Sequence, residues 1–501
     1  MLYLDGSTLG IKALAAAALD PTSQIGLTPE SRVRVQTARD AVERWIAEGR
    51  IVYGMTTGFG EFANVFIPTE HVEHLQENLI ISHSAGMGDP LPDAVVRAMM
   101  ILRVNALAKG LSGIRLSTLD TLIAMINVGI TPTIPEQGSV GSSGDLAPLA
   151  HLALALIGKG EIGGKPAADV LREHGIEPVR LAAKEGLALI NGTQMMCAYG
   201  ALAVDRARRL CDAADIAGAL SADALRGTDN AFDARLHKAR PHPGQIRSAT
   251  NLRSLMHGSA IRASHREGDE RVQDAYSLRC MPQVHGATRD TVEYCASVIE
   301  REMNSATDNP LIFAEDDAHV EGGNFHGQPV ALVLDFLGIA VAELASISER
   351  RTERLVNHAL GGLPRFLTPN GGLHSGMMIA QYTAASMVSE NKVYAHPASV
   401  DSIPTSANQE DHNSMGSIGA RKLWRIVQNV ERVVSIELLC AAQGIDLLRP
   451  LTTSEPLERV IACIRTRVPF ATEDRILYID MNAVHELLLE DAINAAVGVS
   501  L

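Results

Sequence analysis

The segment "PVALVLDFLGIAVAELASISERR" (329–351) is the feature that most limits how this chain can fold. Its apolar residues recur at three- and four-residue steps, the period of one face of an α-helix. The residues that share this face are Val333, Leu337, Val341, Leu344 and Ser348. The opposite face is also mostly apolar until Glu349, so the segment predicts a helix buried in the centre of a bundle. Residues 422–448 form a second long segment of this kind.

Composition supports a fold made of helices packed on helices. Of 501 residues, 46% are hydrophobic and only 4% are aromatic, which favours a bundle over a β-sandwich or barrel. We predict an all-α fold with an N-terminal globular part (1–190), a central bundle of long helices (191–450) and a C-terminal helical segment (451–501). Within the first part, Thr28, Pro29 and Gly49 mark the ends of a helix, and residues 51–68 read as a loop.

Several function classes are excluded or disfavoured. A net charge of −14, without runs of Lys or Arg, argues against nucleic-acid binding. The sequence has six scattered cysteines without a C-x-x-C pair, and its start does not resemble a signal peptide. It also lacks an uncharged apolar run of 18 residues. These features predict a cytoplasmic protein without a membrane span. His71 and His74 share a helix face without an evident third ligand, so no metal site is predicted. The G-x-G-x-x-G at 158–163 is followed by Pro166 and predicts a turn or short hairpin rather than a dinucleotide site.

The stretch "PEQGSVGSSGDLAPLAH" (135–151) places small residues directly before an apolar run. It lacks the Lys-Ser/Thr ending of a phosphate loop. By propensity alone, Ser142 or Ser143 caps the next helix, with Asp145 in its first turn. The chemical alternative is self-cyclisation: a glycine nitrogen attacks a preceding carbonyl, and a serine between them loses its hydroxyl as water. This would leave an electrophilic exocyclic methylene.

"GSVGSSGDLAPLAH" closely resembles the signature of the histidine and phenylalanine ammonia-lyase family, whose Ala-Ser-Gly triplet forms a methylidene-imidazolone ring (MIO). Further motifs follow in family order: "YGMTTGFG" (53–60), "LQENLIISHSAG" (75–86), "EGLALINGTQ" (185–194), "RVQDAYSLRCMPQVHG" (271–286), "SATDNPLIF" (305–313), "GGNFHGQPVA" (322–331) and "HPASVDSIPTSANQEDHNSMG" (396–416). The resemblance implies the ammonia-lyase/fumarase-like fold, a carbon–nitrogen lyase activity on an amino acid, and a homotetramer with shared active sites. It implies no bound organic cofactor or metal. The alternative from another class is an inactive helical scaffold.

The resemblance also assigns the residues that form the ring. Ser143 loses water, Gly144 supplies the ring nitrogen, Ser142 supplies the carbonyl, and Asp145 assists cyclisation. Position 142 is Ser where the family usually has Ala, and its side chain hangs off the ring, so we expect cyclisation to survive.

Other matching positions concern the substrate. Tyr53 matches the residue proposed to take the β-proton, and such a base needs a pKa lowered by its surroundings. Arg279 matches the partner of the substrate carboxylate. The remaining matches are Tyr276, Asn191 and Gln273 around the ring and substrate, and Phe325 as a pocket wall.

Substrate choice is predicted from His83 and Glu410. An imidazole needs partners for both ring nitrogens, which a histidine and a carboxylate supply, so histidine is favoured. "MTTGFGEF" and "HSAG" look more like aromatic lyases and aminomutases, while "HNSMG" and His285 are atypical. These departures leave open a 2,3-aminomutase, which returns the amine to the β carbon, and tyrosine or phenylalanine as substrate.

Overall fold

The computed structural model describes residues 1–58, 60, 64–269 and 271–498. Helices dominate them, which confirms the all-α prediction. The strands of the described chain form four two-stranded sheets: β1 (Leu2–Leu4) with β2 (Ile25–Leu27), β3 (Met87–Pro90) with β4 (Pro135–Gln137), β5 (Glu161–Ile162) with β6 (Lys165–Pro166), and β7 (Leu311–Phe313) with β8 (Ala318–Val320). The first pair is parallel and the other three are antiparallel.

The chain divides into two compact units, each assembled from three segments. Unit 1 comprises Met1–Asp205, Cys295–Asp335 and Pro397–Arg421, and unit 2 comprises Arg206–Tyr294, Phe336–His396 and Lys422–Leu501. The boundaries fall inside or beside long helices, so contacts group segments that are far apart in the sequence. The three-part division along the sequence therefore stays a prediction.

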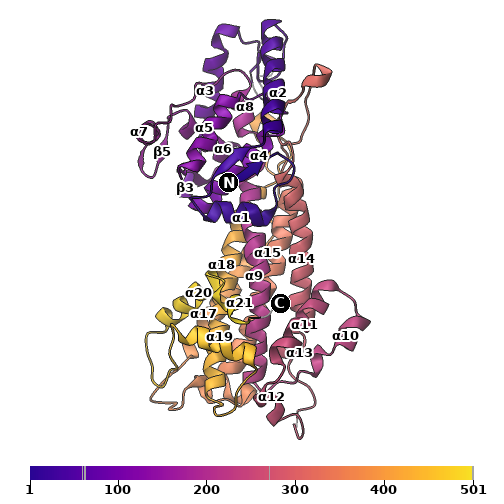
Figure 1. Cartoon of the computed structure of the whole chain (residues 1–501), viewed down its shortest axis with the longest axis vertical. Helices are drawn as coiled ribbons and strands as arrows, with labels where there is room; N and C mark the ends of the chain where they lie inside the picture. Colours follow the sequence, from indigo (N-terminus) through magenta and orange to yellow (C-terminus); the bar gives the residue numbers. More distant parts are fainter. Residues whose placement is uncertain (59, 61–63, 270, 499–501) are drawn as a thin grey trace. The chain divides into compact units, whose positions relative to one another are not determined.

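Unit 1 is built mainly from the N-terminal helices. These are α1 (Ile11–Leu19), α2 (Pro29–Ala47), α3 (Val72–His83), α4 (Asp93–Leu107), α5 (Leu116–Asn127), α6 (Leu146–Leu156), α7 (Ala167–Glu173) and α8 (Glu185–Ile190). In Figure 1 they are coloured indigo to violet; α3, α6 and α8 pack against one another, and α4 packs against α1 and α5. The Thr28 hydroxyl accepts a hydrogen bond from Ser31 N–H, and Pro29 opens α2, which confirms that predicted start.

Two local predictions in unit 1 can be checked directly. Residues 161–166 form the β5–β6 hairpin, with Gly163 and Gly164 at its turn, so the G-x-G-x-x-G is a hairpin as predicted. The predicted loop at 51–68 has turns and one isolated bridge between Thr57 and Phe66 where it is described. Residues 59 and 61–63 of that prediction lie outside the described residues.

Four long helices contribute to both units: α9 (Gln194–Ala224), α14 (Met281–Met303), α15 (Gln328–Val356) and α18 (Gly416–Asp446). Within unit 2, buried polar groups tie them together. Arg351 of α15 makes a 2.5 Å ion pair with Glu437 of α18, which also accepts a bond from Ser221 of α9. His285 of α14 contacts Asp215 of α9 at 2.7 Å.

The other helices complete unit 2. They are α10 (Ala234–Ala239), α11 (Pro243–Met256), α12 (Ala260–Ser264), α13 (Tyr276–Arg279), α16 (His358–Gly361), α17 (Met378–Tyr394), α19 (Glu455–Arg465), α20 (Leu477–Leu489) and α21 (Ala492–Ala496). Short 3-10 turns occur at Thr69–His71, Asn230–Phe232, Ala314–Asp316, Arg365–Leu367 and Ser406–Asn408.

Helix α15 is predicted to be buried on both faces; the structure confirms burial of one face and shows that the opposite face is partly exposed. The predicted face is buried along its length, from Val333 to Ser348. On the opposite face, Leu332, Phe336 and Ile339 are 53%, 44% and 43% exposed, so this chain alone does not bury it. By length and composition α15 is the one helix in the described chain that could span a membrane, but 61% of its apolar window is buried, as in a core helix.

Candidate active site

A cavity of about 460 Å³ in unit 1 brings together most of the predicted catalytic residues. Its walls come from the 51–60 loop, the 142–143 turn, the segments 309–326 and 409–413, and the end of α8. The predicted residues that line it are Tyr53, Ser142, Ser143, Asn191, Phe325 and Glu410. These positions lie as much as 357 residues apart in the sequence (410 − 53), and the fold of unit 1 gathers them.

The turn at Ser142-Ser143 is locked in a conformation that requires glycine after it. Gly141 and Gly144 form a β-bridge around the two serines. Gly144 has φ +76°, and a Cβ there would lie 2.0 Å from the Gly192 carbonyl oxygen. Gly192 N–H in turn donates to the Ser143 carbonyl at 3.3 Å. No residue with a side chain fits at position 144 without moving this backbone.

Asp145 corrects the helix-cap interpretation. Helix α6 begins at Leu146, and the Asp145 side chain makes no capping bond to it. Its Oδ2 instead accepts bonds from Met195 and Met196 N–H, at 2.9 and 3.0 Å, in the first turn of α9. Asp145 is fully buried with Oδ1 unpartnered, and burial raises the carboxyl pKa to about 7. A proton-accepting group therefore lies directly after the triplet.

Tyr53 does not have the lowered pKa that a general base needs. Its hydroxyl accepts a hydrogen bond from Gly60 N–H at 3.1 Å. Burial raises the pKa of Tyr53, and the charges of Glu321 and Glu410 raise it further. Burial is the larger cause, and the cavity adds to it because Glu321 and Glu410 line it while the described lining residues include no Lys or Arg.

Glu410 and His83 occupy different positions relative to the cavity. Glu410 lines it, and its Oε2 accepts a bond from the Thr405 hydroxyl at 2.8 Å. His83, the last residue of α3, is half-buried and is not among the residues that line the cavity. Burial lowers the pKa of His83 while the charge of Glu410 opposes that shift. Glu410 is therefore near enough for its charge to act on the His83 imidazole.

Sequence reasoning missed several polar residues of the cavity, among them Glu321, Asn309, His326 and His412. His326 Nε2–H donates to the His412 carbonyl at 3.0 Å, and the two rings stack with centroids 5.9 Å apart. This contact joins the segment of Phe325 to that of Glu410. All four residues lie within or beside the motifs already recognised at 305–313, 322–331 and 396–416, so these motifs could have identified them as candidate site residues.

Gln273, Tyr276 and Arg279 form a second group, in unit 2, and do not line the cavity. The Arg279 guanidinium lies 4.7 Å from the Tyr276 ring centroid, and its buried Nε has no hydrogen-bond partner. The Tyr276 side chain is 71% exposed.

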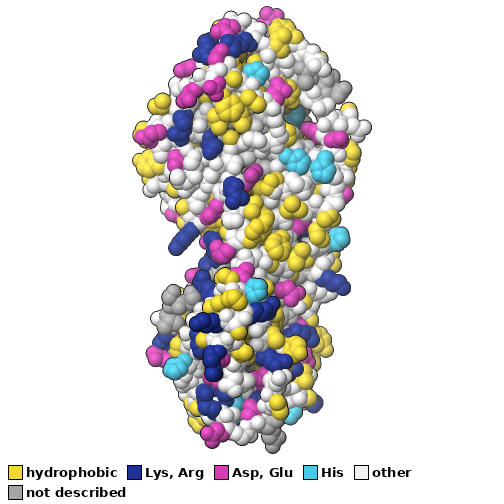
Figure 2. Space-filling model, turned by 90° about the vertical axis from the view of Figure 1, so that its right-hand side faces the viewer, with side chains coloured by type: hydrophobic (Ala, Val, Ile, Leu, Met, Phe, Trp, Pro, Cys, Tyr) yellow, Lys and Arg dark blue, Asp and Glu magenta, His cyan; other side chains and the backbone are white. Residues whose placement is uncertain are grey.

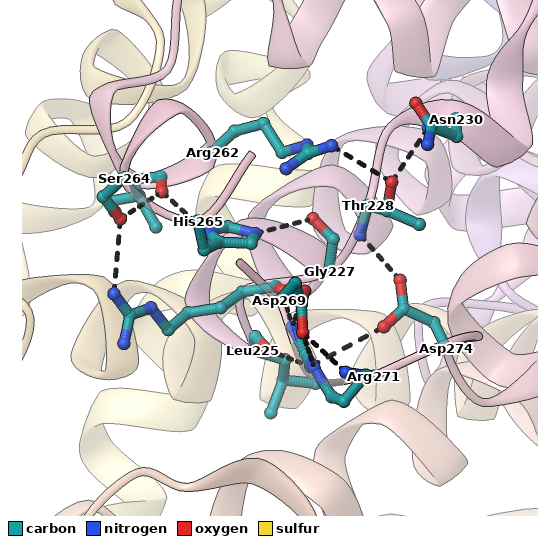
Figure 3. Close-up of polar contacts among 12 residues, drawn as sticks. Leu225, Gly227, Thr228, Asn230, Arg262, Ser264, His265, Asp269, Arg271 and Asp274 are labelled. Atoms are coloured by element: carbon teal, nitrogen blue, oxygen red, sulfur yellow. Dashed lines mark hydrogen bonds and ion pairs between the residues drawn. The ribbon is translucent and has the colours of Figure 1, made fainter. Parts of the chain in front are cut away.

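The loop that leads to this second group is firmly held (Figure 3). Asp274 accepts a bond from Thr228 N–H at 2.6 Å and pairs with Arg271 at 3.6 Å. Arg271 also donates to the carbonyl oxygens of Leu225 and Arg226. Gln273 and Tyr276 are therefore exposed side chains on an anchored backbone.

Comparisons with known proteins agree with this geometry. A family model for aromatic amino acid lyases matches residues 9–466. The histidine ammonia-lyase of Caldanaerobacter subterraneus subsp. tengcongensis is 53% identical over 494 residues, which cover 97% of this chain and 96% of that protein.

Solved structures are similarly close. The histidine ammonia-lyase of Trypanosoma cruzi has a TM-score of 0.93 and 48% identity, covering 99% of this chain and 95% of that one. The tyrosine aminomutase of Streptomyces globisporus has a TM-score of 0.94 and 39% identity, covering 99% and 98%. These similarities include both units.

Proposed function

The chain belongs to the aromatic amino acid lyase family, and on that premise we propose that it is a histidine ammonia-lyase, a carbon–nitrogen lyase that converts L-histidine to urocanate and ammonia. The observation that carries the choice of substrate is a cavity that joins the Ser142-Ser143-Gly144 turn to Glu410. Full-length similarity to histidine ammonia-lyases supports it.

The residues present fit formation of an MIO ring from this turn. Gly144 stands where only glycine is accommodated, Ser143 faces the cavity, and the unpartnered Asp145 Oδ1 offers a buried proton acceptor beside them. Once formed, such a ring supplies an electrophilic methylene that makes the amine a better leaving group. Gly192 N–H lies in place to donate to the Ser143 carbonyl.

The other residues bind and orient the substrate. We assign Glu410, with His83 acting at longer range, to the imidazole, and Phe325 to the wall against which the ring lies. As its phenolate, Tyr53 takes the β-proton and becomes a neutral phenol, the C–H electron pair forms the carbon–carbon double bond, and the C–N bond breaks so that the amine leaves as ammonia. That role requires the Tyr53 pKa to fall once the cavity gains positive charge.

We propose that this charge comes from another copy of the chain. A substrate carboxylate is best held by the fork of an arginine, and the described lining of the cavity includes no Lys or Arg. Arg279 is half-buried in unit 2, beside the exposed Tyr276 ring and close in sequence to the exposed Gln273. A homotetramer with shared active sites places these three residues in a neighbour's cavity.

A cytoplasmic location is part of the proposal. The six cysteines are unpaired in the structure, as in a reducing compartment. The apolar helix α15 is mostly buried in the chain.

The second candidate is an aminomutase. It is favoured by the tyrosine aminomutase structure, whose TM-score of 0.94 is close to the 0.93 of the histidine ammonia-lyase structure. Both reactions begin with the same loss of amine and β-proton. They differ in whether ammonia leaves or adds to the β carbon.

Two measurements test the proposal. Condensation of the Gly144 nitrogen with the Ser142 carbonyl releases one water, and loss of the Ser143 hydroxyl releases a second. The intact mass should therefore be lower than the sequence mass by two water molecules, and an unmodified mass would exclude the ring. Incubation with L-histidine, L-tyrosine and L-phenylalanine should then yield urocanate alone. β-Histidine would indicate the aminomutase, and turnover of tyrosine or phenylalanine without histidine would refute the role of Glu410.

A further inference from the structure

A buried ion pair lies directly behind the cavity residue Asn191. Lys184 Nζ contacts Asp308 Oδ2 at 2.6 Å, and the two side chains are 0% and 1% exposed. Such pairs add little net stability, because desolvation of both charges offsets their attraction. Lys184 also has φ +73°, a conformation that L-residues avoid. Two unfavourable features at one residue suggest a functional constraint.

The pair connects to the side-chain amide of Asn191. Asp308 Oδ1 accepts bonds from Asn309 N–H at 2.7 Å and from Asn191 Nδ2 at 3.5 Å. Asn191 Nδ2 also donates to the Asn309 carbonyl at 3.2 Å. Both amide hydrogens are thus directed at fixed acceptors. No described residue donates to Asn191 Oδ1, which leaves that oxygen for the cavity.

The backbone of Asn191 is fixed from the same side. The buried Arg103 donates to the Asn191 carbonyl at 2.5 Å and to Gln194 Oε1 at 2.8 Å. Lys184 stands at the N-terminal boundary of α8 and Asn191 at its C-terminal boundary. The short helix therefore links the position of the ion pair to the position of the amide.

The positive charge of Lys184 affects how the buried Asp308 carboxyl can interact with Asn191. A buried carboxyl without a cation takes up a proton and becomes a hydrogen-bond donor. A protonated Asp308 would then compete with the Asn309 carbonyl, which accepts from Asn191 Nδ2 at 3.2 Å, for the orientation of the amide. With Lys184 Nζ in contact with Asp308 Oδ2, Asp308 Oδ1 and the Asn309 carbonyl both accept from Asn191 Nδ2, and one orientation of the amide satisfies both acceptors.

We propose that Lys184 and Asp308 are positioning residues that hold Asn191 Oδ1 toward the cavity, where it accepts an N–H from the substrate amine. The inference rests on the proposed function, because it assumes an amino acid in the cavity. It deepens that function by naming what selects for the amine and directs it to the Ser142-Ser143-Gly144 turn.

The first test measures binding without turnover, in a Ser143→Ala background that cannot form the ring. The ligands are L-histidine and 3-(imidazol-4-yl)propionate, which lacks the amine, and their Kd values come from calorimetry. Adding Asp308→Asn should raise the Kd of L-histidine about tenfold and the Kd of the amine-free ligand less than about twofold. Equal increases in both Kd values, or no change in either, would overturn the proposal.

The second test separates positioning from stability in the ring-containing enzyme. Lys184→Met with Asp308→Leu removes both charges and should fold, because an apolar pair can replace a buried ion pair. We expect the intact mass to keep its loss of two waters while kcat falls about 100-fold. A double variant with wild-type kcat would show that the pair is only structural.

The matched control is the pair Arg206–Glu431 of unit 2, also largely buried and in contact at 2.5 Å. Arg206→Met with Glu431→Leu, in the Ser143→Ala background, should leave the ratio of the two Kd values unchanged. Failure of the proposed function is recognised separately, since the wild-type enzyme would then form no urocanate.

Discussion

At the scale of single residues, Gly144 offers the sharpest test of the ring. In Gly144→Ala, the Cβ would collide with the Gly192 carbonyl, and the backbone would keep a φ of +76°. The left-handed φ alone costs about 1–2 kcal/mol of folding free energy. We expect an unmodified intact mass and no turnover.

Gly163→Ala is the matched control for this substitution. Gly163 has φ +58°, but a Cβ added there would meet nothing within 4 Å. It should carry similar backbone strain and still lose two waters. A Gly144→Ala protein with the ring intact would show that the close approach to Gly192 is not required.

Asp145 should make stability depend on pH. Its pKa is raised by burial to about 7, and the nearby Glu302 charge acts in the same direction. Between pH 5 and 7 the folded state therefore holds a proton that the unfolded state has lost. The free energy of unfolding should fall, as pH rises through this range, by about 1.4 kcal/mol per unit from this group.

Asp145→Asn removes the titrating proton and should flatten that slope. Urea unfolding at pH 5, 6 and 7, with wild type in parallel, measures it. Equal slopes in the two proteins would contradict the raised pKa.

Residue roles could be predicted where the cause is local. Thr28 caps α2 through Ser31, three residues along the chain, so sequence sufficed for it. The restriction at Gly144 comes from the distant Gly192 carbonyl, and only the family resemblance assigned a role to this glycine. The partner of Asp145 lies 50 residues away in α9, and that of Lys184 lies 124 residues away. Neither contact leaves a periodic or local signal. The raised pKa of Tyr53 likewise depends on carboxylates that only the fold brings near.

At the scale of elements, the buried contacts among α9, α15 and α18 give a stability prediction. Glu437 accepts two bonds from Arg351 and one from Ser221, and both members of the ion pair are 0% exposed. Glu437→Leu leaves the Arg351 charge buried without its carboxylate. We expect a loss of about 3–5 kcal/mol in urea unfolding.

A surface pair provides the comparison. Arg32 and Asp120 are 43% and 44% exposed and 2.7 Å apart. Asp120→Asn should cost less than about 1 kcal/mol, because water screens both charges. Similar losses in the two variants would mean that burial does not control the energy of these pairs.

Helix α15 shows what periodicity reveals about an element and what it does not. The three- and four-residue steps correctly predicted which residues share its buried face. They could not reveal whether the second apolar face, with Leu332, Phe336 and Ile339, is covered by the same chain. That depends on which elements pack beside it, and in this chain the face stays exposed.

At the scale of the whole molecule, exposed apolar groups are consistent with assembly. On the face drawn in Figure 2, hydrophobic side chains reach the surface in groups rather than singly. Large side chains exposed in unit 2 include Tyr276, Tyr382 and Val393. Apolar surfaces of this kind commonly mark interfaces.

Sharing of active sites between copies can be tested by complementation. Tyr53 lines the cavity of unit 1, whereas Arg279 lies in unit 2 and outside that lining. Tyr53→Phe and Arg279→Met should each be inactive but form the ring, as judged by intact mass. If each site takes these residues from different copies, random co-assembly restores both native residues in about a quarter of the sites.

Co-expressed variants should therefore recover up to about a quarter of wild-type kcat per site, whereas variants mixed after assembly should stay inactive until subunits exchange. The control pairs Tyr53→Phe with a chain that carries both substitutions, a mixture in which no site has a native tyrosine. Activity in this control mixture would reveal contamination by wild-type chains. If the first mixture stays inactive despite mixed assemblies, both residues must come from one chain, and the cation of the cavity has another source.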